Sequence, residues 1–271
     1  VTSQPIDVAF SFDTTGSMYP CLREVRRHMT NNITGLFKNI SNIRVAIIAH
    51  GDYCDKDNPY TIRFLDFSKD VHEICHFIDE TKHTHGGDTP ECYELVLNTA
   101  RKHLSWNKNA IKVLTVIGDA LPHGPSYPEN TRHLDWMDEA KKCAENSIKI
   151  YAVHAMPGIR TSSRPFYETI AKVTDGLYLT LDQFSEINYL IEGICYKQDG
   201  PEKLSEFVER IKPKATRNLQ RVISTLSGKT WDESEFDRKF TKAGLIPVPS
   251  GRFQVFSVLD KIPIKKFVID Q

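Results

Sequence analysis

The chain alternates short apolar runs with segments in which apolar residues recur every three or four positions. Short apolar runs are typical of buried strands, and the wider spacing is typical of amphipathic helices. The predicted strands are residues 6–12, 43–50, 60–67, 111–118, 148–155 and 176–181. The predicted helices are residues 22–40, 71–80, 90–104, 129–146, 164–174 and 183–195. Repeated strand–helix units predict an α/β fold, with a doubly wound, mostly parallel sheet and helices on both faces.

The order of the strands decides where such a sheet would bind a ligand. The run at 60–67 begins with alternating apolar residues, which predicts an edge strand. If the strands, numbered along the chain, lie in the order 3-2-1-4-5-6, the strands at 6–12 and 111–118 flank the reversal of the order. Ligands of doubly wound folds collect at that reversal, outside the carboxyl ends of the strands.

The pattern changes after Cys195, which predicts two parts of the chain, 1–197 and 198–271. A polar stretch with a Gly-Pro break is followed by helical spacing over 204–226, which Pro213 should kink or interrupt. We expect the apolar face of this segment to pack on the preceding domain. A short helix at 231–244 and a strand at 251–259 complete a small α+β appendage. The sequence ends in mid-pattern, so we expect a larger polypeptide.

The amino-acid composition limits the classes of partner that the chain can bind and the compartments that suit it. The 35 basic and 35 acidic residues cancel, which argues against broad electrostatic binding of nucleic acid. No apolar run approaches the roughly 20 residues that span a bilayer, so no membrane insertion is predicted. Six cysteines without a C-x-x-C pair favour reduced thiols and a cytoplasmic location. Two N-x-S/T sequons, at Asn32 and Asn39, keep an extracellular location as the alternative.

A carboxylate and several hydroxyls stand directly after the first predicted strand, in "VAFSFDTTGSM". Asp13, Thr15 and Ser17 alternate, so on an extended turn their side chains can point the same way. Oxygen ligands of this kind suit a hard divalent cation. The stretch lacks the patterns of a phosphate-binding loop, a dinucleotide fingerprint and a nucleophile elbow. Capping of the next helix by Ser17 or Asp13 is the structural alternative.

At this point the sequence resembles the von Willebrand factor A (vWA) family, whose metal-ion-dependent adhesion site reads D-x-S-x-S. Here the motif is D-x-T-x-S, "HTHGGDTPE" supplies Thr89, and "VIGDALPHG" supplies Asp119. The resemblance covers roughly residues 5–197 and implies a vWA or Rossmann-like fold. It also implies that Thr15, Ser17 and Thr89 reach the metal directly, while Asp13 and Asp119 hold it partly through water.

The same resemblance implies Mg²⁺ as the cation, with Mn²⁺ or Ca²⁺ as alternatives. The expected function is metal-dependent binding of a protein partner that offers an acidic side chain, in a scaffold or assembly role, and not enzymatic catalysis. One alternative is a metal-dependent phosphatase or hydrolase, although Thr15 stands where a phosphatase would carry its acid–base aspartate. Another is a regulatory domain of a larger kinase or ATPase.

Other polar residues near these motifs allow two interpretations each. His83 and His85 have a spacing that could bind zinc, although a solvated loop is the simpler interpretation. His123 could border the metal or lie in an exposed turn, and Asp88 could support the site or cap a helix. For Asp52 and Asp55, an ordinary acidic loop is expected.

Overall fold

The computed structural model describes residues 4–57, 59–87 and 89–229, together with three short strands further along the chain. The chain divides into two compact units, Val1–Ser227 and Gly228–Gln271. In the second unit, β7 (Leu245–Pro247), β8 (Phe253–Phe256) and β9 (Pro263–Phe267) form an antiparallel sheet. The helix predicted at 231–244 lies outside the described residues.

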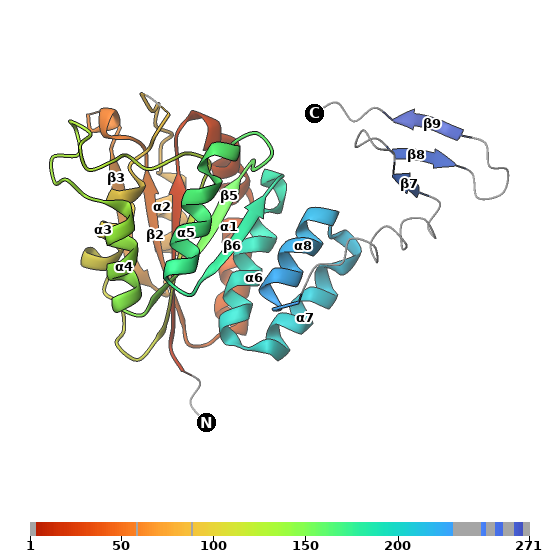
Figure 1. Cartoon of the computed structure of the whole chain (residues 1–271). Coiled ribbons are helices and arrows are strands. Elements are labelled where there is room, and N and C mark those ends of the chain that lie inside the picture. The colour runs from red at the N-terminus through yellow and green to blue at the C-terminus, as the bar shows by residue number, and fades with distance from the viewer. Residues whose placement is uncertain are drawn as a thin grey trace. The chain divides into compact units, whose positions relative to one another are not determined.

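A six-stranded sheet forms the centre of the first unit (Figure 1). Its strands are β1 (Ile6–Asp13), β2 (Ile43–His50), β3 (Ile62–Ser68), β4 (Ile111–Gly118), β5 (Ile148–Ala155) and β6 (Leu177–Leu181). Their order is β3-β2-β1-β4-β5-β6, and all neighbours pair in parallel except β3, which is antiparallel to β2. The predicted fold class and the predicted edge position of β3 are therefore confirmed.

Helices cover both faces of this sheet. One face carries α1 (Tyr19–Asn39), α2 (Val71–Asp79) and α6 (Ile187–Asp199), and the other carries α3 (Tyr93–His103), α4 (Trp136–Glu145) and α5 (Arg164–Val173). Because both faces are covered, every residue of β1 is buried. This explains why the central strands are nearly continuous apolar runs in the sequence.

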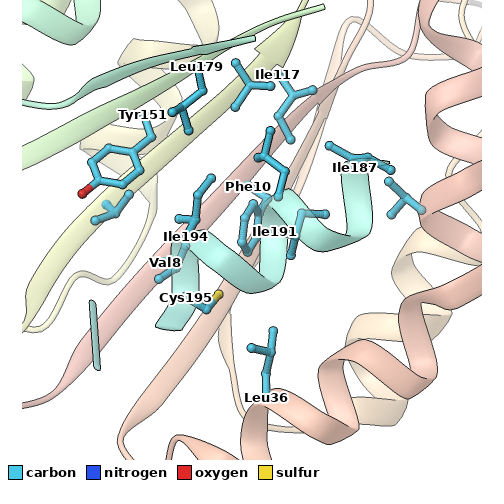
Figure 2. Packing of buried hydrophobic residues seen from close by; sticks show 14 of the residues in the cluster. Val8, Phe10, Leu36, Ile117, Tyr151, Leu179, Ile187, Ile191, Ile194 and Cys195 are labelled. Carbon is cyan, nitrogen blue, oxygen red and sulfur yellow. The ribbon is translucent and has the colours of Figure 1, made fainter. Parts of the chain in front are cut away.

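The packing of α6 shows how one face of the sheet is closed. Ile187, Ile191 and Ile194 follow each other at helical spacing and lie over Val8 and Phe10 of β1 (Figure 2). All five side chains are at most 1 % exposed. This part of the core therefore consists of the apolar side of α6 packed on β1, as the helical spacing of the sequence predicts. None of the described helices is both long and apolar enough to cross a membrane.

Two further helices extend the first unit beyond the predicted boundary at residue 197. Helices α7 (Pro201–Ile211) and α8 (Arg217–Leu226) are separated by a 3-10 turn that contains Pro213, so the predicted interruption is confirmed. Leu204, Phe207 and Leu226 are buried in the same cluster as α6. The compact unit therefore ends at Ser227 and not at 197, because the apolar stripes of both helices are covered by α6.

The reversal of strand order lies between β1 and β4. In their register Phe12 is opposite Ile117, so the chain leaves both strands at the same edge of the sheet. Asp13 is the last residue of β1 and Asp119 directly follows β4. The topology thus brings two parts of the predicted site together at the place where this fold class binds ligands.

Candidate metal centre

Four of the five predicted metal-site residues line one cleft, of about 410 Å³, at the carboxyl edge of the sheet. They are Thr15, Ser17, Thr89 and Asp119, which come from three separate loops. We refer to this space as the cleft. Hydroxyl and carboxyl oxygens gathered in this way are the donor set that hard divalent cations prefer.

Ser17 and Asp119 contact each other across the cleft. After β1, a 3-10 turn at Gly16–Met18 carries the Ser17 hydroxyl to within 3.2 Å of Asp119 Oδ1, to which it donates. Asp119 is 2 % exposed. Burial raises the pKa of Asp119, and the negative charge of Asp13 adds to this shift. Two carboxyl groups that disfavour each other's charge are a setting in which a cation would be stabilised.

Asp13, the fifth predicted residue, lies behind the cleft wall. Its Oδ1 accepts hydrogen bonds from the backbone nitrogen of Thr15 at 2.9 Å and from the Thr15 hydroxyl at 2.6 Å. Its Oδ2 accepts a hydrogen bond from the Tyr93 hydroxyl at 2.7 Å. Burial raises the pKa of Asp13, against the effect of these hydrogen bonds. Asp13 therefore orients Thr15, which does line the cleft.

Thr15 and Ser17 do not cap the helix that follows them. Neither the Gly16–Met18 turn nor α1 has a side-chain capping hydrogen bond, and the residue at the N-cap of α1 is Met18. The hydroxyl of Thr15 bonds to Asp13, and the hydroxyl of Ser17 bonds to Asp119. Both hydroxyls thus belong to the cleft rather than to the helix end.

Glu91 is a wall residue of the cleft that the sequence motif does not predict. It is 5 % exposed, and its Oε2 has no hydrogen-bond partner among the described residues. Burial, with the charge of Asp13 next in importance, raises the pKa of Glu91 to about 10. A buried oxygen without a partner is costly, so its presence beside Thr89 fits a site that accommodates a cation. The available signal was the sequence T-P-E, two positions after Thr89.

Buried carboxylates hold the glycine loop that leads to Thr89. Asp55 accepts hydrogen bonds from the backbone nitrogens of Asp52 (3.0 Å), His85 (3.0 Å) and Gly86 (3.1 Å). Asp52 and Asp55 are 0 % and 3 % exposed, so the prediction of an ordinary acidic loop is wrong. The reason is that their oxygens satisfy loop amides that would otherwise be buried without partners.

His123 lies neither at the metal site nor in an exposed turn. It is 2 % exposed, and its Nε2 is 2.6 Å from Asp52 Oδ1. His123 therefore supports the loop that follows Asp119 and does not line the cleft.

Arg160 is a second cleft residue that the sequence motifs do not predict. Its Nε donates to Asp119 Oδ2 at 3.2 Å, and the Ser163 hydroxyl lies 2.8 Å from the carbonyl oxygen of Asp119. Both residues come from the segment after β5, which no local pattern links to Asp119. Only the fold brings them together.

The zinc interpretation of the two loop histidines gains no support. The rings of His83 and His85 are 5.3 Å apart. Among residues 4–57, 59–87 and 89–229, no group of three or more His, Cys, Asp or Glu side chains is placed to hold a metal ion. A cation in the cleft would therefore depend on hydroxyl ligands. Asp88 lies outside the described residues.

Comparison with solved structures supports the type of fold. The pilus adhesin SpaC from Lactobacillus rhamnosus GG, in its open conformation, matches with a TM-score of 0.57 and 14 % identity, over 76 % of this chain and 31 % of the adhesin. A second structure of the same adhesin matches with a TM-score of 0.56 over the same shares. The conserved hypothetical protein BatB from Bacteroides thetaiotaomicron matches at 15 % identity over 75 % of this chain and 99 % of the BatB chain. Its TM-score of 0.49 is too low to support a conclusion about the fold.

The two adhesin structures, with the strand order described above, show a fold of the vWA type. The chain spans about a third of the adhesin that it matches. No family model and no curated protein matches the sequence.

Proposed function

We propose that this chain is a protein-interaction module that depends on a divalent cation. The observation that carries the proposal is the convergence of Thr15, Ser17, Thr89 and Asp119 on one cleft at the reversal of strand order. The buried Asp13 behind them fixes the Thr15 hydroxyl. Oxygen donors favour Mg²⁺, with Mn²⁺ or Ca²⁺ as alternatives.

In this proposal the three hydroxyl residues would reach the cation, and Asp119 and Asp13 would hold it partly through water. A cation with few direct carboxylate ligands keeps much of its charge, and this charge would attract an acidic side chain of a protein partner. The match to an adhesin is consistent with an interaction role. Nothing in this chemistry needs a base or a nucleophile from the chain.

The position of Asp13 supports binding over hydrolysis. A phosphatase nucleophile must reach its substrate, but Asp13 is 1 % exposed, and both of its oxygens accept hydrogen bonds from Thr15 or Tyr93. Asp13 is also not among the residues that line the cleft. A binding role for the cleft therefore fits the contacts better than a covalent phosphoryl intermediate.

Titration with Mn²⁺ alone tests the cation site. Ser17→Ala and Thr89→Ala should each weaken Mn²⁺ binding by about tenfold or more, because each removes a ligand oxygen. Ser185→Ala, which removes an exposed hydroxyl outside the cleft, is the matched control. Failure of the unmodified protein to bind Mn²⁺ or Mg²⁺ would refute the proposal.

An acidic probe tests the interaction role. A synthetic peptide with one central aspartate should bind only with Mn²⁺ present and should be released by EDTA, while its asparagine counterpart should not bind. Turnover of an aryl phosphate that Asp13→Asn abolishes would favour the phosphatase alternative instead.

A further inference from the structure

Arg160 places a positive charge on the carboxylate that the proposed cation would use. Its Nε lies 3.2 Å from Asp119 Oδ2, while the Ser17 hydroxyl is on Oδ1. Asp119 is 2 % exposed, whereas the Arg160 side chain is 43 % exposed and lines the cleft. A guanidinium therefore already balances the charge of Asp119 on the solvent side of the site.

The backbone that carries Arg160 is fixed by hydrogen bonds. Met156 has a φ of 47°, and its carbonyl oxygen accepts from the backbone nitrogens of Ile159 and Arg160, both at 2.9 Å. The carbonyl oxygen of Arg160 lies 2.9 Å from the Ser163 hydroxyl and 3.0 Å from His154 Nε2. The turn thus holds the Cα of Arg160 at the cleft, and the side chain is the part that can meet a ligand.

The geometry gives this guanidinium two opposing electrostatic effects. A divalent cation near Asp119 would share that carboxylate with Arg160 and would be repelled by it at short range. An incoming carboxylate would be attracted by both positive charges. Within the described part of the chain, the hydrogen bond found for the Arg160 guanidinium uses Nε. Its Nη groups can then donate to an anion in the fork geometry that arginine offers carboxylates.

We propose that Arg160 couples the two ligands of the cleft: it weakens binding of the cation alone and strengthens binding of the acidic partner. This inference rests on the proposed cation site. It also defines the partner group more narrowly, because a carboxylate can present one oxygen to the cation and the other to Arg160. A neutral amide or hydroxyl could accept a hydrogen bond from the guanidinium, but it would gain neither the attraction between opposite charges nor the paired geometry.

Two substitutions and one control test the first half. Arg160→Gln keeps a long polar side chain without the charge, and Arg160→Ala removes the whole group. Both should bind Mn²⁺ about tenfold more tightly than the unmodified protein, a coupling of ordinary size. Arg164→Ala is the control, because Arg164 is an exposed arginine nearby in sequence that pairs with Glu168 and does not line the cleft.

The single-aspartate peptide in saturating Mn²⁺ tests the second half. It should bind about tenfold more weakly to both Arg160 variants than to the unmodified protein and to Arg164→Ala. A merely structural role for Arg160 would weaken both ligands, so opposite signs are diagnostic. Unchanged or weaker Mn²⁺ binding by an Arg160→Gln protein that keeps its melting temperature would overturn the inference alone. Absence of Mn²⁺ binding by the unmodified protein would overturn both the inference and the proposed function.

Discussion

At the scale of single residues, the contact between Tyr93 and Asp13 depends on the absence of a side chain at Gly118. A Cβ at Gly118 would lie 1.9 Å from the Tyr93 hydroxyl oxygen and 2.9 Å from that of Tyr167. Both tyrosines are fully buried and cannot move into solvent. The glycine at the end of β4 is therefore what allows Tyr93 to reach Asp13.

Gly118→Ala should lower the free energy of unfolding by about 1–3 kcal/mol, the usual cost of overpacking a buried site. Urea denaturation followed by circular dichroism measures this. Gly124→Ala is the control, since a Cβ there would meet nothing within 4 Å. Equal stabilities of the two variants would show that Tyr93 does not depend on Gly118.

Glu94 is the residue from which we expect a pH-dependent contribution to stability. It is 0 % exposed, accepts a hydrogen bond from the Tyr53 hydroxyl at 2.7 Å and another from the backbone nitrogen of His123 at 3.1 Å. Burial raises the pKa of Glu94 from 4.5 to about 7, against the effect of these hydrogen bonds. Between these pH values the folded chain holds a proton that the unfolded chain has lost. The stabilising contribution of Glu94 is therefore complete below pH 4.5 and is lost as the pH rises to about 7.

Glu94→Gln removes this titration; its amide oxygen can still accept from the backbone nitrogen of His123, and its amide nitrogen can donate to the Tyr53 hydroxyl. Relative to this variant, the unmodified protein should lose on the order of 1–3 kcal/mol of unfolding free energy between pH 4.5 and pH 8. Urea denaturation at several pH values measures the difference. Glu145→Gln, at an exposed position, controls for loss of a carboxyl group. Parallel pH profiles for Glu94→Gln and the unmodified protein would contradict the assignment.

At the scale of secondary-structure elements, the strands were predictable, whereas the helix starts were predictable only in part: those of α2 and α5 are as predicted and that of α4 is not. Buried parallel strands such as β4 and β5 are continuous apolar runs, so their limits can be read directly from the sequence. Helix α4 was expected from residue 129 but begins at Trp136, after Asp135 accepts hydrogen bonds from the next backbone nitrogens. The capping side chain of Asp135 fixes the start of α4. The helical spacing of the sequence continues into the polar loop before Asp135 and therefore does not show where the helix begins.

The candidate site divides in the same way. Asp13, Thr15, Ser17 and Asp119 could be predicted because each lies at the end of a recognisable strand or in the turn that follows it. Tyr93 and Arg160 could not, because each acts through a contact far away in sequence, such as that between Arg160 and Asp119. A motif identifies the oxygens that line a site, and the tertiary fold supplies the groups that orient or neutralise them.

At the scale of the whole molecule, the first unit needs the two helices beyond residue 197. Gly193 of α6 sits so close to them that a Cβ there would be 3.0 Å from Leu226 Cδ1 and 3.1 Å from Phe207 Cε1. Both side chains are at most 2 % exposed. Without α7 and α8 this face of α6 would be open to water, although the vWA resemblance ends near its last turn.

A fragment of residues 1–229 should therefore unfold cooperatively, while a fragment of residues 1–197 should be less stable by at least about 3 kcal/mol, comparable to the loss of one large buried side chain. The reason is that the shorter fragment loses Leu204, Phe207 and Leu226 from the cluster that includes α6. Phe207→Ala in the longer fragment should alone cost about 3 kcal/mol. Calorimetry of the three proteins decides the point. Equal melting temperatures for the two fragments would mean that α7 and α8 pack on a domain that is already stable and do not add to its stability.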